Sequence, residues 1–289
     1  MSETHTQSDQ QYKAGVRREW AMAAPGWERW FETTESEHAG RVITQALLDA
    51  AKLKAGEAVL DVGAGYGEPG LSAAAAVGPT GHVTCLDISG DMLAFAERRA
   101  RQAGLRNVDF VEADIETHAL EPNSFDAVLS RAALMYASNP LATLRRLSAS
   151  LRPGGRIAIA VWASPDRVAF AVPVGVMIEM GVIDPPTPGP GPFALGEDGL
   201  LAELVRSAGF EDVSSGSAIA TFETLSPQAC TQWLRDVAPP ITELIAHHPR
   251  DVQEMVWTRV TDAWAPFQDD SGAVRLPCTA IWVAARVPA

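Results

Sequence analysis

Three carboxylates end or follow apolar segments in the first half of the chain. Asp61 lies in VLDVGAGYG, Asp87 ends HVTCLD, and Asp114 follows VDFVEA. The first segment runs into the turn GAGYGEPG, whose glycines fit the spacing G-x-G-x-x-G that lets a backbone approach a nucleotide. Acids at three successive strand ends favour a positively charged ligand with a ribose and an adenine. The alternative is a nicotinamide dinucleotide, but Glu68 at the start of the next helix would repel its pyrophosphate.

The elements that must position these acids alternate regularly between residues 55 and 163. Five apolar segments typical of buried strands are separated by amphipathic helical patterns. This rhythm predicts an α/β fold with a doubly wound, mostly parallel sheet that helices cover on both faces. Ligands of such sheets bind beyond the carboxyl ends of the strands, which is where the three acids are expected.

The alternation stops after residue 163. The segment PPTPGPGPF is too rich in proline for a helix or an inner strand, and residues 226–267 look helical again. We therefore expect two insertions to fold over the ligand end of the sheet as a cap. The expected division is a flexible N-terminus (1–19), N-terminal helices with the ligand-binding core (20–163), a cap or lid insertion (164–196), a core continuation (197–225), a helical cap (226–267) and a final core strand (268–289).

The composition limits the class of protein. The 289 residues carry a net charge of −13, which disfavours nucleic acid as a partner. No apolar run is long enough to cross a bilayer, so we expect no membrane insertion. The three scattered cysteines match neither a zinc spacing nor a disulfide framework, which favours a reducing cytoplasm and predicts no bound metal. A monomer or homodimer that acts on a small molecule fits these limits.

Five ordered segments carry a resemblance to a known family. VLDVGAGYG, LDIS, EADIE, FDAVLSRAAL and LRPGGRIAI resemble, in order and spacing, the motifs of the class I methyltransferases that depend on S-adenosyl-L-methionine (SAM). The small-molecule branch related to the ubiquinone and menaquinone C-methyltransferases looks most similar, and PGPFALGEDGLLAELVRSAGFEDV resembles the tail of that group. The resemblance implies a Rossmann-like fold with a seven-stranded sheet, SAM as the cofactor, and methyl transfer as the activity.

The resemblance also implies roles for single residues around the cofactor. Asp61 would organise the glycine loop and the methionine end, Asp87 would hold the ribose hydroxyls, and Asp114 would accept from the adenine amino group. Arg131 would lie near the methionine moiety or the substrate, with a surface ion pair as the alternative. The expected cofactor set is Asp61, Gly63, Gly65, Gly67, Asp87, Ile88, Met92, Asp114, Ile115 and Arg131.

Catalytic candidates follow from what methyl transfer needs: a nucleophile held in line, water excluded and, for some acceptors, a base. Glu179 stands in an apolar stretch, so desolvation would raise its pKa unless it faces water. Glu35 and His38 are three residues apart and could act as a base, hold a metal ion for a diphosphate substrate, or form a helix-surface pair. Tyr136 follows the fourth strand and could orient a substrate. Glu179, Tyr136 and His38 are therefore the expected catalytic residues.

Aromatic residues near the N-terminus suit a flat or prenyl-like substrate, although packing in the core is the alternative. The expected substrate-binding set is Trp20, Trp30, Glu35 and Met135. The sequence predicts a SAM-dependent methyltransferase of secondary or quinone-like metabolism that acts on a small, mostly apolar metabolite. C-methylation is favoured over O-methylation. Alternatives from other classes are an NAD-dependent oxidoreductase and a SAM-binding protein that transfers no methyl group.

Overall fold

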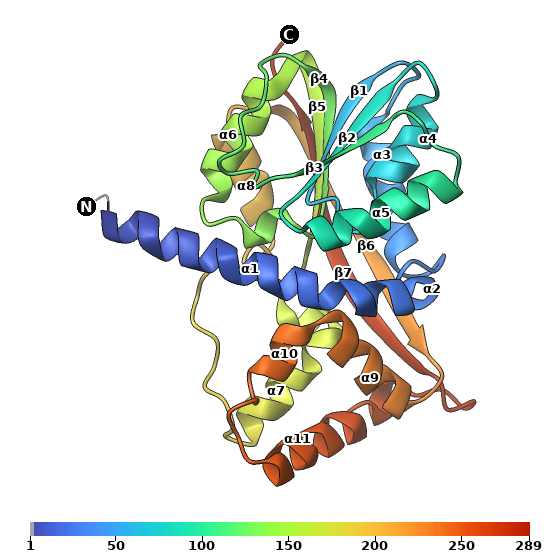
Figure 1. The fold of residues 1–289 in the computed structure, drawn as a ribbon, viewed down its shortest axis with the longest axis vertical. Helices are drawn as coiled ribbons and strands as arrows, with labels where there is room; N and C mark the ends of the chain where they lie inside the picture. Colours follow the sequence, from blue (N-terminus) through green and yellow to red (C-terminus); the bar gives the residue numbers. More distant parts are fainter. Residues whose placement is uncertain (1–2) are drawn as a thin grey trace.

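The core of the protein is one mixed sheet (Figure 1). The computed structural model describes residues 3–289, and within them seven strands pair in the order β3-β2-β1-β4-β5-β7-β6. Neighbours are parallel from β3 to β5, whereas β7 is antiparallel to both β5 and β6. The doubly wound, mostly parallel sheet is therefore confirmed. The strands are β1 (Ala58–Val62), β2 (His82–Asp87), β3 (Val108–Glu112), β4 (Phe125–Arg131), β5 (Leu151–Trp162), β6 (Glu211–Thr224) and β7 (Val274–Arg286).

The order of the strands reverses between β1 and β4. From this point β2 and β3 extend the sheet to one side, and β4 to β6 extend it to the other. Val59, Leu60 and Val62 of β1 are at most 2% exposed, as expected for a parallel strand that is covered on both faces. Ligands of doubly wound sheets bind beyond the carboxyl ends of the strands at such a reversal, so the fold points to the ends of β1 and β4.

Helices cover both faces of the sheet: α3, α4 and α5 lie on one face, and α6 and α8 on the other (Figure 1). Capping side chains explain where some of them begin. The Oγ of Ser89 accepts the N–H of Met92 at the start of α5, and the Oδ1 of Asn139 accepts the N–H of Ala142 at the start of α6. The α-helices are α1 (Glu3–Arg29), α2 (Phe31–Thr34), α3 (Gly40–Ala51), α4 (Gly70–Val77), α5 (Gly90–Gln102), α6 (Pro140–Ser150), α7 (Val172–Glu179), α8 (Leu200–Ser207), α9 (Pro227–Val237), α10 (Pro239–Glu243) and α11 (Arg250–Asp262).

The N-terminal helix corrects the expectation that residues 1–19 form a flexible lead-in. Residues 1–2 lie outside the described part of the chain, but residues 3–29 form α1, which crosses the ligand end of the sheet and packs against α5 and α9 (Figure 1). The Tyr12 hydroxyl donates to the Tyr136 carbonyl at 3.0 Å, and the Arg17 Nε donates to the Ile88 carbonyl at 3.1 Å. These bonds fasten the helix to the loops that follow β2 and β4.

The two insertions lie beyond the ligand end of the sheet. Helices α7, α9, α10 and α11 gather there, and α1 passes between them and the sheet (Figure 1). The proline-rich segment between α7 and α8 contains no strand or α-helix. The division into core and cap segments stays an interpretation. Over residues 3–289, no helix combines the length and apolar character needed to cross a membrane.

Candidate functional site

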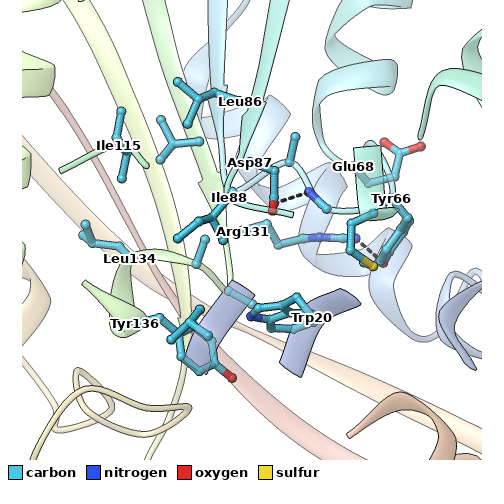
Figure 2. Close-up of a pocket in the computed structure, with 18 of the residues that line it drawn as sticks. Trp20, Tyr66, Glu68, Leu86, Asp87, Ile88, Ile115, Arg131, Leu134 and Tyr136 are labelled. Carbon is cyan, nitrogen blue, oxygen red and sulfur yellow. Dashed lines mark hydrogen bonds between the residues drawn. The ribbon is translucent and has the colours of Figure 1, made fainter. Parts of the chain in front are cut away.

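A cavity lies at the carboxyl ends of β1, β2 and β4, and α1 forms one of its walls (Figure 2). The loops after β1 to β4 line one part of it, and side chains from α1, α3, β5 and β6 line the rest. The structure therefore brings together residues far apart in sequence, and their roles remain predictions. The residues named from the sequence that line the cavity are Trp20, Gly63, Gly65, Asp87, Ile88, Met92, Asp114, Ile115, Arg131 and Tyr136.

The glycine loop between β1 and α4 needs glycine for two reasons. Gly63, Gly65 and Gly67 have φ of +69°, +52° and +104°, a region that other residues rarely adopt. A Cβ on Gly63 would also lie 2.1 Å from the Cβ of Ala133 in the loop after β4. Gly63 and Gly65 line the cavity, but Gly67 does not and instead packs against α4 and α5. Its expected contact with the cofactor is therefore corrected to a role in shaping the turn.

Asp87 at the end of β2 holds the glycine loop in place. Its Oδ2 accepts the N–H of Gly65 and its Oδ1 accepts the N–H of Ser89, both at 2.8 Å. Each carboxylate oxygen can accept a further hydrogen bond, and Asp87 lines the cavity. Burial raises the pKa of Asp87, which the backbone donors partly oppose. Ile88 and Met92 line the cavity next to it.

Asp61 lies beneath the glycine loop rather than in the cavity lining. Its Oδ2 accepts the N–H of Gly70 at 2.8 Å, so this acid does organise the turn. The side chain is fully buried behind the loop, and its expected role toward the methionine end stays a prediction. Its Oδ1 has no hydrogen-bond partner among the described residues, and burial raises its pKa to about 7.

Asp114 follows β3 and meets a cation that the sequence reasoning missed. Its Oδ1 accepts the N–H of Glu116 at 2.9 Å and forms an ion pair with the Lys13 Nζ at 3.2 Å. Lys13 pairs with Glu116 as well. Lys13 belongs to α1, and nothing in its local sequence marks it as a site residue. This end of the cavity, with Ile115 beside it, is therefore closed by the N-terminal helix.

Arg131 at the end of β4 belongs to a buried network. It donates to both carboxylate oxygens of Glu35, at 3.1 and 3.0 Å, and to Gly40 O and Thr44 Oγ1 at 2.8 and 2.7 Å. The Tyr66 hydroxyl donates to Glu35 Oε2 at 2.6 Å and contacts the guanidinium (Figure 2). The expected alternative of a surface ion pair is wrong, since the pair is buried. Glu35 pairs with Arg131 and does not line the cavity, and its expected contact with a substrate stays a prediction.

Aromatic side chains gather at the other end of the cavity. Trp20 meets Tyr136 edge to face with ring centroids 5.8 Å apart, and Trp27 stacks on Tyr66 at 5.1 Å. Figure 2 shows Trp20 beside Tyr136, with Asp87 and Ile115 above them in the view. Burial raises the pKa of Tyr136, so its hydroxyl stays protonated and is a hydrogen-bond donor rather than a base.

Four residues that the sequence placed in the site lie elsewhere. Glu179 and His38 are exposed to solvent, away from the cavity lining. The Trp30 Nε1 donates to Asp236 at 2.8 Å and joins α1 to α9. Met135 is buried beneath the loop after β4. None of the four lines the cavity, and their expected roles in catalysis or substrate binding stay predictions.

The insertions reach the cavity only through other side chains. No described residue of 164–196 or 226–267 lines it. Instead Phe170 packs on Trp162 with ring centroids 5.1 Å apart, and Trp233 packs on Phe222 at 5.2 Å. Trp162 and Phe222, at the ends of β5 and β6, form the far wall. The sequence reasoning missed both, because their position depends on the sheet order and on the long antiparallel pair β6–β7.

Comparisons with known proteins agree with this geometry. Residues 53–169 match a family described as a methyltransferase domain. Aklanonic acid methyltransferase DauC of Streptomyces sp. (strain C5) is 36% identical over 112 residues, which are 39% of this chain and 51% of the relative. The ubiquinone/menaquinone biosynthesis C-methyltransferase UbiE of Pseudomonas fluorescens (strain SBW25) is 31% identical over 125 residues, which are 43% of this chain and 49% of the relative. The matches thus span about half the length of these curated relatives.

A solved structure extends the likeness in fold to the rest of the chain. Phosphoethanolamine N-methyltransferase 2 of Haemonchus contortus aligns with a TM-score of 0.58 at 18% identity, covering 92% of this chain and 57% of that one. At this identity the likeness shows the fold alone. Residues 53–169 are therefore similar to methyltransferase domains, and the sheet and its helices have the Rossmann-like fold of the solved methyltransferase structure.

Proposed function

We propose that the protein transfers a methyl group from SAM to a small, mostly apolar acceptor. The observation that carries the proposal is the arrangement at the end of β2. There Asp87 faces the cavity while it holds Gly65 of the glycine loop by its backbone N–H. Acids at the strand ends suit a donor with positive charges, a ribose and no phosphate.

The residues of the cavity fit such a donor. Asp87 offers free acceptor sites for ribose hydroxyls, and Ile88 and Met92 offer apolar surface for an adenine. Asp114 offers an acceptor for the adenine amino group, although it shares its Oδ1 with Lys13. The missing side chain of Gly63 lets Ala133 of the loop after β4 pack directly against the glycine loop. When bound, SAM would supply a methyl group on a sulfonium, which is already a strong electrophile.

The remaining half of the cavity supports an apolar acceptor. Trp20, Tyr136, Trp162 and Phe222 present aromatic surface there, which fits a flat or quinone-like molecule. The likeness to UbiE favours a carbon as the methylated atom. A desolvated base on the cap would also have favoured attack by carbon. Glu179 on α7 is exposed and does not supply one. O-methylation of a natural product is the alternative.

Calorimetry with the full chain tests the donor. We expect heat of binding from SAM and from S-adenosylhomocysteine, and none from NADH at the same concentrations. Asp87→Ala should weaken both adenosyl ligands by at least about tenfold through the lost ribose contacts, or about 1.4 kcal/mol. Asp109→Ala, an exposed acid on β3 outside the cavity, is the matched control. Uptake of NADH without uptake of SAM would instead support a dehydrogenase.

A second assay separates transfer from simple binding. The protein is incubated with SAM and candidate acceptors, and S-adenosylhomocysteine and methylated product are measured by mass. Product with a new carbon-bound methyl group in the NMR spectrum supports C-methylation, and a methoxy signal supports the alternative. Binding of SAM without any S-adenosylhomocysteine across a broad set of acceptors would favour a SAM-binding protein that transfers no methyl group.

A further inference from the structure

The two halves of the cavity differ in their chemistry. Glu68, Asp87 and Asp114 lie around the glycine loop and the ends of β2 and β3. The opposite half is built from one kind of surface, here called the apolar wall, made of Trp20, Ile43, Leu134, Tyr136, Trp162 and Phe222. Among the described residues of this wall there is no carboxylate and no imidazole. The charge of Glu19 acts on Tyr136 from outside the cavity lining, so a charge in contact with the wall has to come from a ligand.

The charged groups at the boundary between the halves are already paired. Glu68 accepts from Arg99 at 2.9 Å and from the Ser72 hydroxyl at 2.6 Å. The guanidinium of Arg131 is met by both oxygens of Glu35. Each of these groups would lose hydrogen bonds between charged partners if it turned toward an acceptor, and such bonds are among the stronger ones in proteins. The paired groups at the boundary therefore present little net charge to a ligand at the apolar wall.

The phenols of the cavity do not supply a base either. The Tyr66 hydroxyl is held by Glu35 and Arg131, and burial raises its pKa well above the usual value. Burial also raises the pKa of Tyr136. Both phenols stay protonated at neutral pH, so an acceptor that must lose a proton has to lose it by its own acidity.

We propose that the acceptor is a flat aromatic or enolic compound whose own hydroxyl is acidic enough to make it an anion at neutral pH. The inference rests on the proposed function and deepens it. The acceptor anion gives an electron pair to the methyl carbon, the carbon–sulfur bond breaks, and the electrons of that bond stay on sulfur as a neutral thioether. Both charges disappear in the same step, and no proton has to leave through the apolar wall.

Charge favours an anion over an amine. A neutral amine that takes the methyl group becomes a cation, which the apolar wall would have to hold with no carboxylate beside it. An anion next to a bound sulfonium is instead attracted by it, because both lie where water is scarce and Coulomb energy is large. An anion of this kind can react through its carbon or through its oxygen. The apolar wall is compatible with either mode of attack.

A binding experiment tests the inference without relying on turnover. The probes are 2-hydroxy-1,4-naphthoquinone, which is an anion at neutral pH, its neutral methyl ether, and 2-amino-1,4-naphthoquinone. Their dissociation constants are measured on protein saturated with sinefungin, a donor analogue with an ammonium in place of the sulfonium, and on protein saturated with S-adenosylhomocysteine, which has no such charge. We expect the anion to bind at least about tenfold more tightly with sinefungin, and the ether and amine to change less than about twofold.

Two variants place the probe at the wall. Trp162→Leu and Phe222→Leu should each weaken the anion several-fold, while sinefungin binds as in the unchanged protein. Three results would overturn the inference. They are equal affinity of the anion for the protein loaded with sinefungin and with S-adenosylhomocysteine, no binding of the anion, and an affinity for the anion that is unchanged in both variants. If neither adenosyl ligand binds at all, the proposed function itself fails. Turnover with SAM should follow the same order, with product from the anion and none from its ether.

Discussion

Replacing Glu35 by glutamine is expected to destabilise the protein strongly, because it removes the counter-charge of a buried guanidinium. The Arg131 and Glu35 side chains are 7% and 5% exposed, so water can replace little of the lost interaction. Both hydrogen bonds of the pair, at 3.0 and 3.1 Å, reach carboxylate oxygens. In the variant, one of these oxygens becomes an amide nitrogen that cannot accept from the guanidinium.

The size of the effect follows from the remaining partners. Breaking a buried ion pair by removing one member costs about 3–5 kcal/mol, because an uncompensated charge stays buried. Gly40 and Thr44 still accept from Arg131, so we expect the low end, about 3 kcal/mol. The same substitution at Glu28, whose ion pair with Arg98 is 2.7 Å long but about half exposed, should cost less than about 1 kcal/mol.

The assay is urea unfolding of five proteins: the unchanged chain, Glu35→Gln, Arg131→Met, the double variant of these two, and Glu28→Gln. The free energy of unfolding in water comes from the midpoint and slope of each transition. We expect the double variant to be less destabilised than the sum of the single variants by about 2 kcal/mol, since it leaves no buried charge unpaired. Additive losses would refute the reasoning, as would equal losses for Glu35→Gln and Glu28→Gln.

Three further predictions test other parts of the site. Gly63→Ala should lower the free energy of unfolding by about 1–3 kcal/mol more than Gly104→Ala, since φ is +69° and +70° but only the first new Cβ meets a close neighbour; equal losses in urea would contradict this. Because burial raises the pKa of Asp61 from 3.8 to about 7, the folded state holds its proton more tightly, so stability should fall as pH rises through this window. Asp61→Asn should remove that fall, and identical pH profiles in thermal unfolding would count against it. Glu179→Gln and His38→Gln should keep SAM affinity and turnover within about twofold, and a large loss would restore either residue as a catalytic candidate.

The positions of the strand-end acids could be predicted from the sequence because they depend on few assumptions. Parallel strands place their carboxyl ends at one edge, so Asp87 and Asp114 had to lie near each other once the alternation was recognised. The glycines of the loop after β1 follow equally from local geometry. Neither prediction depends on how distant segments of the chain pack.

The partners of these residues could not be predicted, because they come from segments that meet only in the fold. Glu35 and Arg131 are joined across 96 positions, and no spacing rule links them. Glu179 looked desolvated because its neighbours in sequence are apolar. In the structure α7 turns Pro173 and Met177 inward and leaves Glu179 exposed, so a helix in an apolar stretch still has one side in water.

One helix closes both halves of the cavity, which links the two ligands physically. Lys13 reaches Asp114 at the cofactor end, and Trp20 meets Tyr136 at the aromatic end. These two residues of α1 are seven positions apart, two helical turns or about 10 Å, so they move together unless the helix bends. Loss of the Lys13 ion pair at the cofactor end is therefore expected to loosen the packing of Trp20 in the apolar wall as well. Because the same helix packs at both ends, a ligand at the strand ends and a ligand at the apolar wall would each contact one rigid element.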